Sequence, residues 1–172
     1  RLSPPQGISG MTNALPMGPF GRICDVPPWP GVPVHTAWDL GVSRGGDTMT
    51  VGLWQIAPGE RGKGQIRVID CLSGSSYSIM HYANELRQKR QAIADQFVQS
   101  YEATCGIDYV PHDARVPEMT SSGHDGKAKL RIEVMIECGL KPKIVTNHHV
   151  SDGVSAVRKM LPRCWFDRAK SE

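Results

Sequence analysis

Alternating apolar and polar residues predict three consecutive strands in the first half of the chain. The ranges are 34–41, 47–56 and 65–72, and each is rich in β-branched or aromatic residues. Residues 57–64, between the second and third ranges, combine proline and glycine with charged residues, which is typical of a hairpin turn. The three strands are therefore predicted to form an antiparallel meander.

The apolar spacing then changes to that of a helix. Residues 78–101 place apolar side chains three or four positions apart, which predicts a long helix with one buried face. A fourth strand is predicted at 107–110, where Pro111 ends it, and a short fifth strand at 143–146.

Residues 127–138 fit two interpretations. Their apolar positions alternate as in a strand, but their length, the Lys129/Glu133 pair and Gly139 as a C-terminal cap favour a helix, which is our prediction.

A last helix is predicted near the C-terminus. Ser151 or Asp152 would cap it, and it would end at about Leu161, before Pro162. Its inward-facing residues are predicted to be Val154, Val157 and Leu161. The resulting order, β-β-β-α-β-α-β-α, predicts a mixed sheet flanked by helices, an α/β fold.

The first 33 residues have a different character. They hold eight of the 13 prolines, and proline removes a backbone donor and fixes φ. We expect residues 1–33 to form an irregular linker or arm, packed on the core through Phe20, Ile23 and Trp29. Residues 34–172 would then form the folded domain.

The amino-acid composition argues against several classes of protein. With 40% hydrophobic and 22% charged residues, the chain can build a core and is not disordered, and its net charge of +3 does not by itself indicate nucleic-acid binding. Five widely spaced cysteines argue against a disulfide scaffold or a thiolate zinc site. No apolar run reaches the roughly 20 residues of a membrane span. A soluble, cytoplasmic protein is expected.

Two aspartates directly follow predicted strands. Asp39 ends the first strand and Asp113 comes just after the fourth. If these strands are neighbours, both carboxylates reach one sheet edge, where they could hold one or two divalent cations that activate water and stabilise a pentavalent phosphate. Taken alone, Asp39 is better explained as a turn residue that ends a strand, and His112-Asp113 can be a polar turn after proline; the pair of aspartates is more specific than either residue.

Four segments in this order resemble the nuclease domain of the large terminase subunit of tailed bacteriophages. They are residues 37–41 (AWDLG), 43–48 (SRGGDT), 111–115 (PHDAR) and 161–167 (LPRCWFD). The resemblance runs from about residue 34 to the end. It implies an RNase H-like fold that cuts concatemeric double-stranded viral DNA with little sequence preference, by a two-metal mechanism using Mg²⁺ or Mn²⁺.

The resemblance also implies residue roles and partners. Asp39 and Asp113 match the family's metal ligands, and Asp70 is a weaker outer-sphere candidate. The expected partners are viral DNA, the terminase ATPase domain, the small terminase subunit and the portal, in the host cell cytoplasm. No membrane partner is expected.

The chain departs from the family in one respect. The family takes a third metal carboxylate from a later helix, and this sequence ends at Glu172, as a truncated domain would. Asp167 belongs to the matched LPRCWFD segment and is not that ligand. A non-cleaving module that binds DNA or packaging partners is therefore the alternative function. No Gly-x-x-x-x-Gly-Lys-Ser/Thr segment is present, so ATPase activity is not expected.

Several basic residues flank the candidate site in sequence. If many of them border one sheet edge, they would contact DNA phosphates. The candidates are Arg44, Arg61, Lys63, Arg115, Lys127 and Lys129.

Two further interpretations carry less weight. Residues 147–149 (NHH) are reminiscent of a histidine-metal nuclease, but no second metal motif lies at a usable spacing. The Asp39-Leu40-Gly41 turn also occurs in sugar-kinase and actin-like ATPases, which need two such domains.

Overall fold

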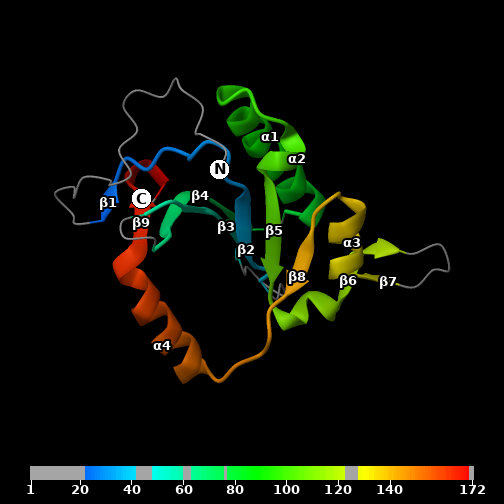
Figure 1. Cartoon of the computed structure of the whole chain (residues 1–172). Coiled ribbons are helices and arrows are strands. Elements are labelled where there is room, and N and C mark those ends of the chain that lie inside the picture. The colour runs from blue at the N-terminus through cyan, green and yellow to red at the C-terminus, as the bar shows by residue number, and fades with distance from the viewer. Residues whose placement is uncertain (1–21, 42–47, 60–62, 76, 123–127, 171–172) are drawn as a thin grey trace.

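A seven-stranded mixed sheet forms the centre of the computed structural model, which describes residues 22–41, 48–59, 63–75, 77–122 and 128–170 (Figure 1). The strand order is β1-β9-β4-β3-β2-β5-β8. The strands are β1 (Ile23–Cys24), β2 (Val34–Asp39), β3 (Thr48–Ala57), β4 (Gln65–Ser75), β5 (Cys105–Val110), β8 (Pro142–Ile144) and β9 (Cys164–Asp167). The expected mixed α/β fold is confirmed.

The predicted meander is present as β2-β3-β4, with antiparallel pairing throughout. β5 pairs parallel with β2, and β8 pairs parallel with β5. Because β4 and β2 are both antiparallel to β3, the strands β2, β4, β5 and β8 all end on the same side of the sheet. We call this side the carboxyl edge.

Helix α1 (Ile79–Gln96) packs on one face of the sheet through Tyr82, Leu86 and Ile93, which belong to the hydrophobic core. The predicted helix over 78–101 is too long. Helix α1 ends at Gln96 with Phe97 as its C-cap, and Val98 has a positive φ of 52°. A separate short helix, α2, follows (Tyr101–Thr104).

The ambiguous stretch at 127–138 contains both kinds of structure. β7 (Ala128–Leu130) pairs with β6 (Pro117–Ser122) in a separate hairpin, and α3 (Arg131–Glu137) follows directly. A single helix was therefore the wrong prediction, and Lys129 forms its ion pair with Glu137 rather than Glu133. The cap at Gly139 is confirmed by its φ of 79°.

Helix α4 (Val150–Met160) differs most from its prediction. His149, not Ser151 or Asp152, is its N-cap. Val154, Val157 and Leu161 do not face inward: their exposed fractions are 43%, 55% and 44%, and no residue of α4 is buried. In Figure 1 the helix extends away from the sheet, so its apolar stripe lacks a packing partner among the described residues.

Residues 22–33 pack against the sheet. The Gln55 side chain accepts a hydrogen bond from the Trp29 N–H at 2.6 Å and donates to the carbonyl of Val32 at 2.7 Å. The guanidinium of buried Arg67 lies 4.7 Å from the Trp29 ring centroid. Ile23 forms part of edge strand β1, and Phe20 lies outside the described residues.

Strand β9 was not predicted, although it contains the CWFD residues of the resemblance. It pairs parallel with β4 and with β1, following a turn of 3-10 helix, η3 (Leu161–Arg163). None of the helices in the described ranges has the length and apolar character needed to cross a membrane.

Candidate functional site

The structure brings Asp39 and Asp113 to the same edge of the sheet. β2 and β5 are neighbouring parallel strands, with Ala37 opposite Tyr109. Asp39 is the last residue of β2, and Asp113 lies in η2 (His112–Arg115), the turn directly after β5. Adjacent strands are about 5 Å apart, so Asp39 and the turn that carries Asp113 lie at neighbouring strand ends. The condition on which the metal-site prediction depended is met.

The surroundings of Asp39 hold it rigidly but leave its side chain exposed. Its neighbours Trp38 and Leu40 are only 5% and 2% exposed, so they anchor the strand end in the core. The Gly41 N–H donates a long hydrogen bond of 3.4 Å to Oδ1 of Asp39. Gly41 has a positive φ of 47°, which lets the chain turn sharply after the carboxylate.

Asp113 is held by the core in a similar way. Ala114 is fully buried, and the turn is closed by hydrogen bonds from the Ala114 N–H to the Pro111 carbonyl and from the Val116 N–H to the Asp113 carbonyl. The Oδ1 atom of Asp113 is buried, and none of the described residues hydrogen-bonds to it. A buried oxygen without a donor is costly, and a bound cation would compensate it.

The end of β8 reaches this edge too. The Val145 N–H donates to the Val110 carbonyl at 2.9 Å, and residues 147–149 follow. His149 is engaged in capping α4, with Nδ1 2.8 Å from Oγ of Ser151. Within the described ranges, no three His, Cys, Asp or Glu side chains cluster as a metal-binding group. The geometry therefore offers a two-carboxylate site.

Asp70 lies away from the two aspartates. It was expected at a strand end, but β4 continues to Ser75, and Asp70 sits opposite Leu53. Its carboxylate forms an ion pair with Lys89 on α1 and accepts a hydrogen bond from the Cys71 N–H at 2.8 Å. These contacts join α1 to the sheet.

The basic candidates do not all border the carboxyl edge. Arg115 does, because it is exposed and lies in the same turn as Asp113. Lys63 lies at the opposite side of the sheet, because the tip of an antiparallel hairpin is remote from the end of β2, so it does not border the edge that carries Asp39. Lys129 is paired with Glu137. Arg44, Arg61 and Lys127 lie outside the described residues.

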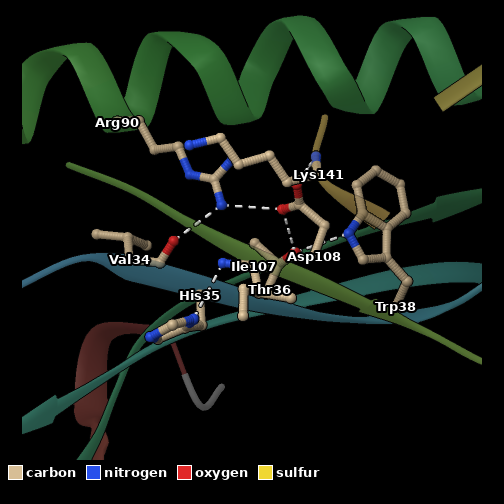
Figure 2. Close-up of polar contacts among 8 residues, drawn as sticks. All are labelled: Val34, His35, Thr36, Trp38, Arg90, Ile107, Asp108 and Lys141. Carbon is tan, nitrogen blue, oxygen red and sulfur yellow. Dashed lines mark hydrogen bonds and ion pairs between the residues drawn. The ribbon is translucent and has the colours of Figure 1, made fainter. Parts of the chain in front are cut away.

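A buried polar network beneath the site joins its supporting elements (Figure 2). Oδ1 of Asp108 on β5 accepts hydrogen bonds from Thr36 on β2 at 2.7 Å and from Arg90 on α1 at 2.9 Å. Its Oδ2 accepts from the Lys141 N–H at 2.7 Å, and Arg90 also donates to the Val34 carbonyl at 2.8 Å. The Arg90 and Asp108 side chains are 3% and 0% exposed. One ion pair thus connects α1, both site-bearing strands and the start of β8.

Sequence reasoning missed this pair, although a signal was present. Arg90 falls on the apolar face of α1, between Leu86 and Ile93, and Asp108 occupies a buried position of an alternating strand. Charged residues at predicted core positions are rarely buried unless they are paired.

His35 completes the contact between β2 and β5. Its Nδ1 accepts a hydrogen bond from the Ile107 N–H at 3.0 Å, and its ring stacks on Trp54 with centroids 4.8 Å apart. Burial, together with the positive charge of Arg90, lowers the pKa of His35 below its usual value. The folded protein therefore favours the neutral imidazole, whose Nδ1 can act as an acceptor.

Two hollows are found in the described part of the chain. One of about 440 Å³ is lined by Asp25, Asp167, Arg168 and Ala169, and one of about 220 Å³ lies between α1 and α3. Neither includes Asp39 or Asp113. A site that lies outside these hollows suits an extended polymer better than a small molecule, which binds in a concave pocket.

Comparison with solved structures finds a matching chain. The large terminase from a thermophilic bacteriophage superposes with a TM-score of 0.58 at 14% sequence identity, over 85% of this chain and 31% of that one. The chain has the fold of part of a large terminase. The mixed α/β fold expected from the sequence is thus confirmed, and it is consistent with the terminase RNase H-like fold that the resemblance implied. No protein-family model and no curated protein matches the sequence.

The superposed region is only part of the bacteriophage protein. This chain spans about a third of the length of the bacteriophage protein. At 14% identity the similarity concerns the fold, and the chemistry has to be argued from the residues at the carboxyl edge.

Removing Arg90 should destabilise the protein strongly. Arg90→Ala leaves the Asp108 carboxylate buried without its cation, so we expect the free energy of unfolding to fall by about 3–5 kcal/mol in denaturant titration. Lys89→Ala is a control on the same helix, because its ion pair with Asp70 is partly exposed; we expect a loss of about 1 kcal/mol or less. Equal losses for the two variants would contradict a special role for the buried pair.

Acid should weaken the fold through His35. Because its pKa is lowered in the folded state, the unfolded chain binds more protons below about pH 6.5, so stability falls as the pH drops through that range. His35→Asn keeps an acceptor but cannot titrate there. The free energy of unfolding, measured between about pH 5 and 7.5, should decline less steeply for the variant. Parallel pH profiles would refute this assignment.

Proposed function

We propose that this chain is the metal-dependent endonuclease domain of a viral DNA-packaging terminase. Its substrate would be concatemeric double-stranded DNA, cut with little sequence preference. The observation that carries the proposal is the pair Asp39 and Asp113 at the ends of adjacent parallel strands, with Oδ1 of Asp113 buried and lacking a donor among the described residues. The terminase-like fold supports it.

The two carboxylates suit a magnesium or manganese site. Both cations prefer hard oxygen ligands, and both aspartates are held by buried neighbours at a rigid sheet edge. When bound, such ions activate water and stabilise the charge on a phosphate undergoing in-line displacement, which is the two-metal mechanism we propose. Asp39 and Asp113 would orient the ions, and the carboxyl edge would admit the phosphodiester.

Features of the edge favour DNA as the substrate. Arg115 is exposed two residues after Asp113 and can reach a phosphate beside the cleaved bond. Four strand spacings separate β4 from β8, so this edge is about 19 Å wide. The carboxyl edge is therefore wide enough to lie across one DNA duplex. Contacts made mainly to phosphates would explain low sequence preference.

The remaining partners follow from the resemblance to terminases. An ATPase domain, a small terminase subunit and a portal would act with this domain in the host cell cytoplasm. The similar protein from a thermophilic bacteriophage is described as a large terminase, and the chain corresponds to about a third of it.

A second candidate function is a non-cleaving module that binds DNA or packaging partners. It is favoured by a specific observation: the described residues hold no cluster of three metal-ligating side chains. The two candidates differ in whether cutting depends on added metal.

Asp113→Asn should abolish cleavage while preserving the fold. The amide is nearly isosteric but carries no charge, so metal affinity and transition-state stabilisation fall together, and nicking of supercoiled plasmid in Mn²⁺ or Mg²⁺ should slow roughly 100-fold or more. Asp39→Asn should behave alike. Asp70→Asn is the matched control, because Asp70 pairs with Lys89 in the middle of β4, away from the two aspartates; its nicking rate should stay within about threefold.

The assay also decides between the two functions. EDTA should stop nicking by the wild-type chain. If Asp113→Asn retains wild-type activity, the assignment fails. If the folded wild-type chain binds DNA in a salt-sensitive way but never cuts, the non-cleaving module is the better function.

The salt dependence of DNA binding should distinguish Arg115, at the carboxyl edge, from Lys63, at the opposite side of the sheet. Arg115→Gln should reduce the slope of log affinity against log salt by about one, because one phosphate contact is lost. Lys63→Gln should leave the slope unchanged, because Lys63 lies at the opposite side of the sheet. Fluorescence anisotropy over a series of salt concentrations measures both, and equal slopes for all three proteins would contradict the placement of DNA at the carboxyl edge.

A further inference from the structure

An exposed aromatic pair stands where β4 meets α1. The rings of Tyr77 and His81 are stacked, with centroids 4.2 Å apart and planes inclined by 16°. Tyr77 is 56% exposed, and the His81 side chain is 40% exposed. Large aromatic side chains are usually buried, so two parallel rings facing solvent call for a partner.

The pair is held in place from beneath. The Tyr77 ring lies against Gly74, where an added Cβ would come within 2.9 Å of ring carbons. Tyr82 donates a hydrogen bond to the Gly74 carbonyl at 2.8 Å, which attaches the first turn of α1 to the strand end. Nε2 of His81 lies 3.4 Å from Oε1 of Glu85, which restrains the His81 ring. The two rings therefore form a preorganised surface.

This surface lies on the same side of the sheet as the candidate site. Asp39 lies opposite Thr50, and Thr50 lies opposite Ser73, so β4 is two strands, or about 10 Å, from β2. Tyr77 follows the end of β4 on the same carboxyl edge, four residues beyond Ser73, which is level with Asp39. Thr48 and Ser75, whose hydroxyl oxygens are 3.2 Å apart, lie at the ends of the two strands beside it.

The chemistry of the pair suits a nucleobase rather than a phosphate. Residues 77–84 (YSIMHYAN) contain no lysine or arginine to neutralise phosphate. Because the two rings stack on one another, what they offer is the outer face of the stacked pair, a flat aromatic face of the kind on which bases stack, irrespective of sequence. Paired bases inside a duplex are inaccessible to such a surface, but bases at a frayed or newly cut end are not.

We propose that Tyr77 and His81 stack on an unpaired base of the DNA strand next to the cut. This inference rests on the proposed nuclease function and adds a binding surface to it. The aromatic pair would hold the separated end of the strand while Arg115 and the metal site engage the phosphates. Its contribution would be independent of salt, unlike that of the basic residues.

The test uses the full 172-residue chain in EDTA, which prevents cutting. The probe is a duplex with a short overhang carrying 2-aminopurine, whose fluorescence is quenched by stacking, and the reference is the same duplex closed at both ends by hairpin loops. The variants are Tyr77→Ala, Tyr77→Phe and Met80→Ala. Met80 is a matched control, because it is 59% exposed on the same turn of α1.

The expected pattern is specific to the unpaired base. Tyr77→Ala should lose the quenching and bind the overhang duplex between roughly five- and 100-fold more weakly, with the salt slope unchanged. Its binding to the closed duplex should change less than about twofold. Tyr77→Phe and Met80→Ala should behave as the wild type does. Gly74→Ala, which displaces the Tyr77 ring without altering its chemistry, should reproduce the loss of quenching.

Other outcomes overturn the inference. If Tyr77→Ala and the wild type quench and bind equally, the pair does not stack on DNA. If both DNAs lose affinity alike, the ring supports the fold or a general contact. Plasmid nicking is measured separately with the wild type and Asp113→Asn. If the wild type nicks the plasmid and Asp113→Asn does not, the proposed function stands even when the stacking result is negative.

Discussion

The ion pair between Arg90 and Asp108 is the interaction on which the arrangement of this protein depends. Asp108 receives donors from β2, α1 and the residue before β8, and Arg90 also reaches the backbone of β2. Because both charges are buried, each requires the other, and the elements that carry them cannot shift independently. The register of β2 against β5 sets Thr36 opposite Asp108, where its hydroxyl donates to the same carboxylate oxygen as Arg90.

That register decides what the carboxyl edge presents. Asp39 and Asp113 extend from strands fixed by the core, with buried neighbours on either side of Asp39 and a fully buried alanine after Asp113. Carboxylates held in this way would bind a cation with little further entropic cost of ordering themselves. Arg115 lies in the same turn as Asp113, and the Tyr77–His81 pair follows the end of β4 on the same side of the sheet, so this edge carries charge and aromatic surface as well as the two aspartates.

The errors of sequence interpretation have local physical causes. Residues 128–137 contain a strand followed at once by a helix, and a window that spans both shows mixed periodicity. In α4 the amphipathic spacing was read correctly, but spacing cannot say whether a partner covers the apolar stripe. The sequence could not show that Lys63 lies opposite the carboxyl edge, because the direction of a hairpin relative to a distant strand end is decided by topology.

The sequence by itself determined the local elements and the candidate chemistry. Alternation, helical spacing and turn residues are short-range properties, so the meander, the main helix and the aspartates at strand ends could be read directly. Only the tertiary structure decided that β2 and β5 are neighbours, that Asp70 pairs with Lys89, and that Tyr77 and His81 stack on the same side of the sheet as the aspartates. These depend on contacts between residues far apart in the chain, whose pairing is selected by burial and by the cost of leaving a charge such as Asp108 without a partner.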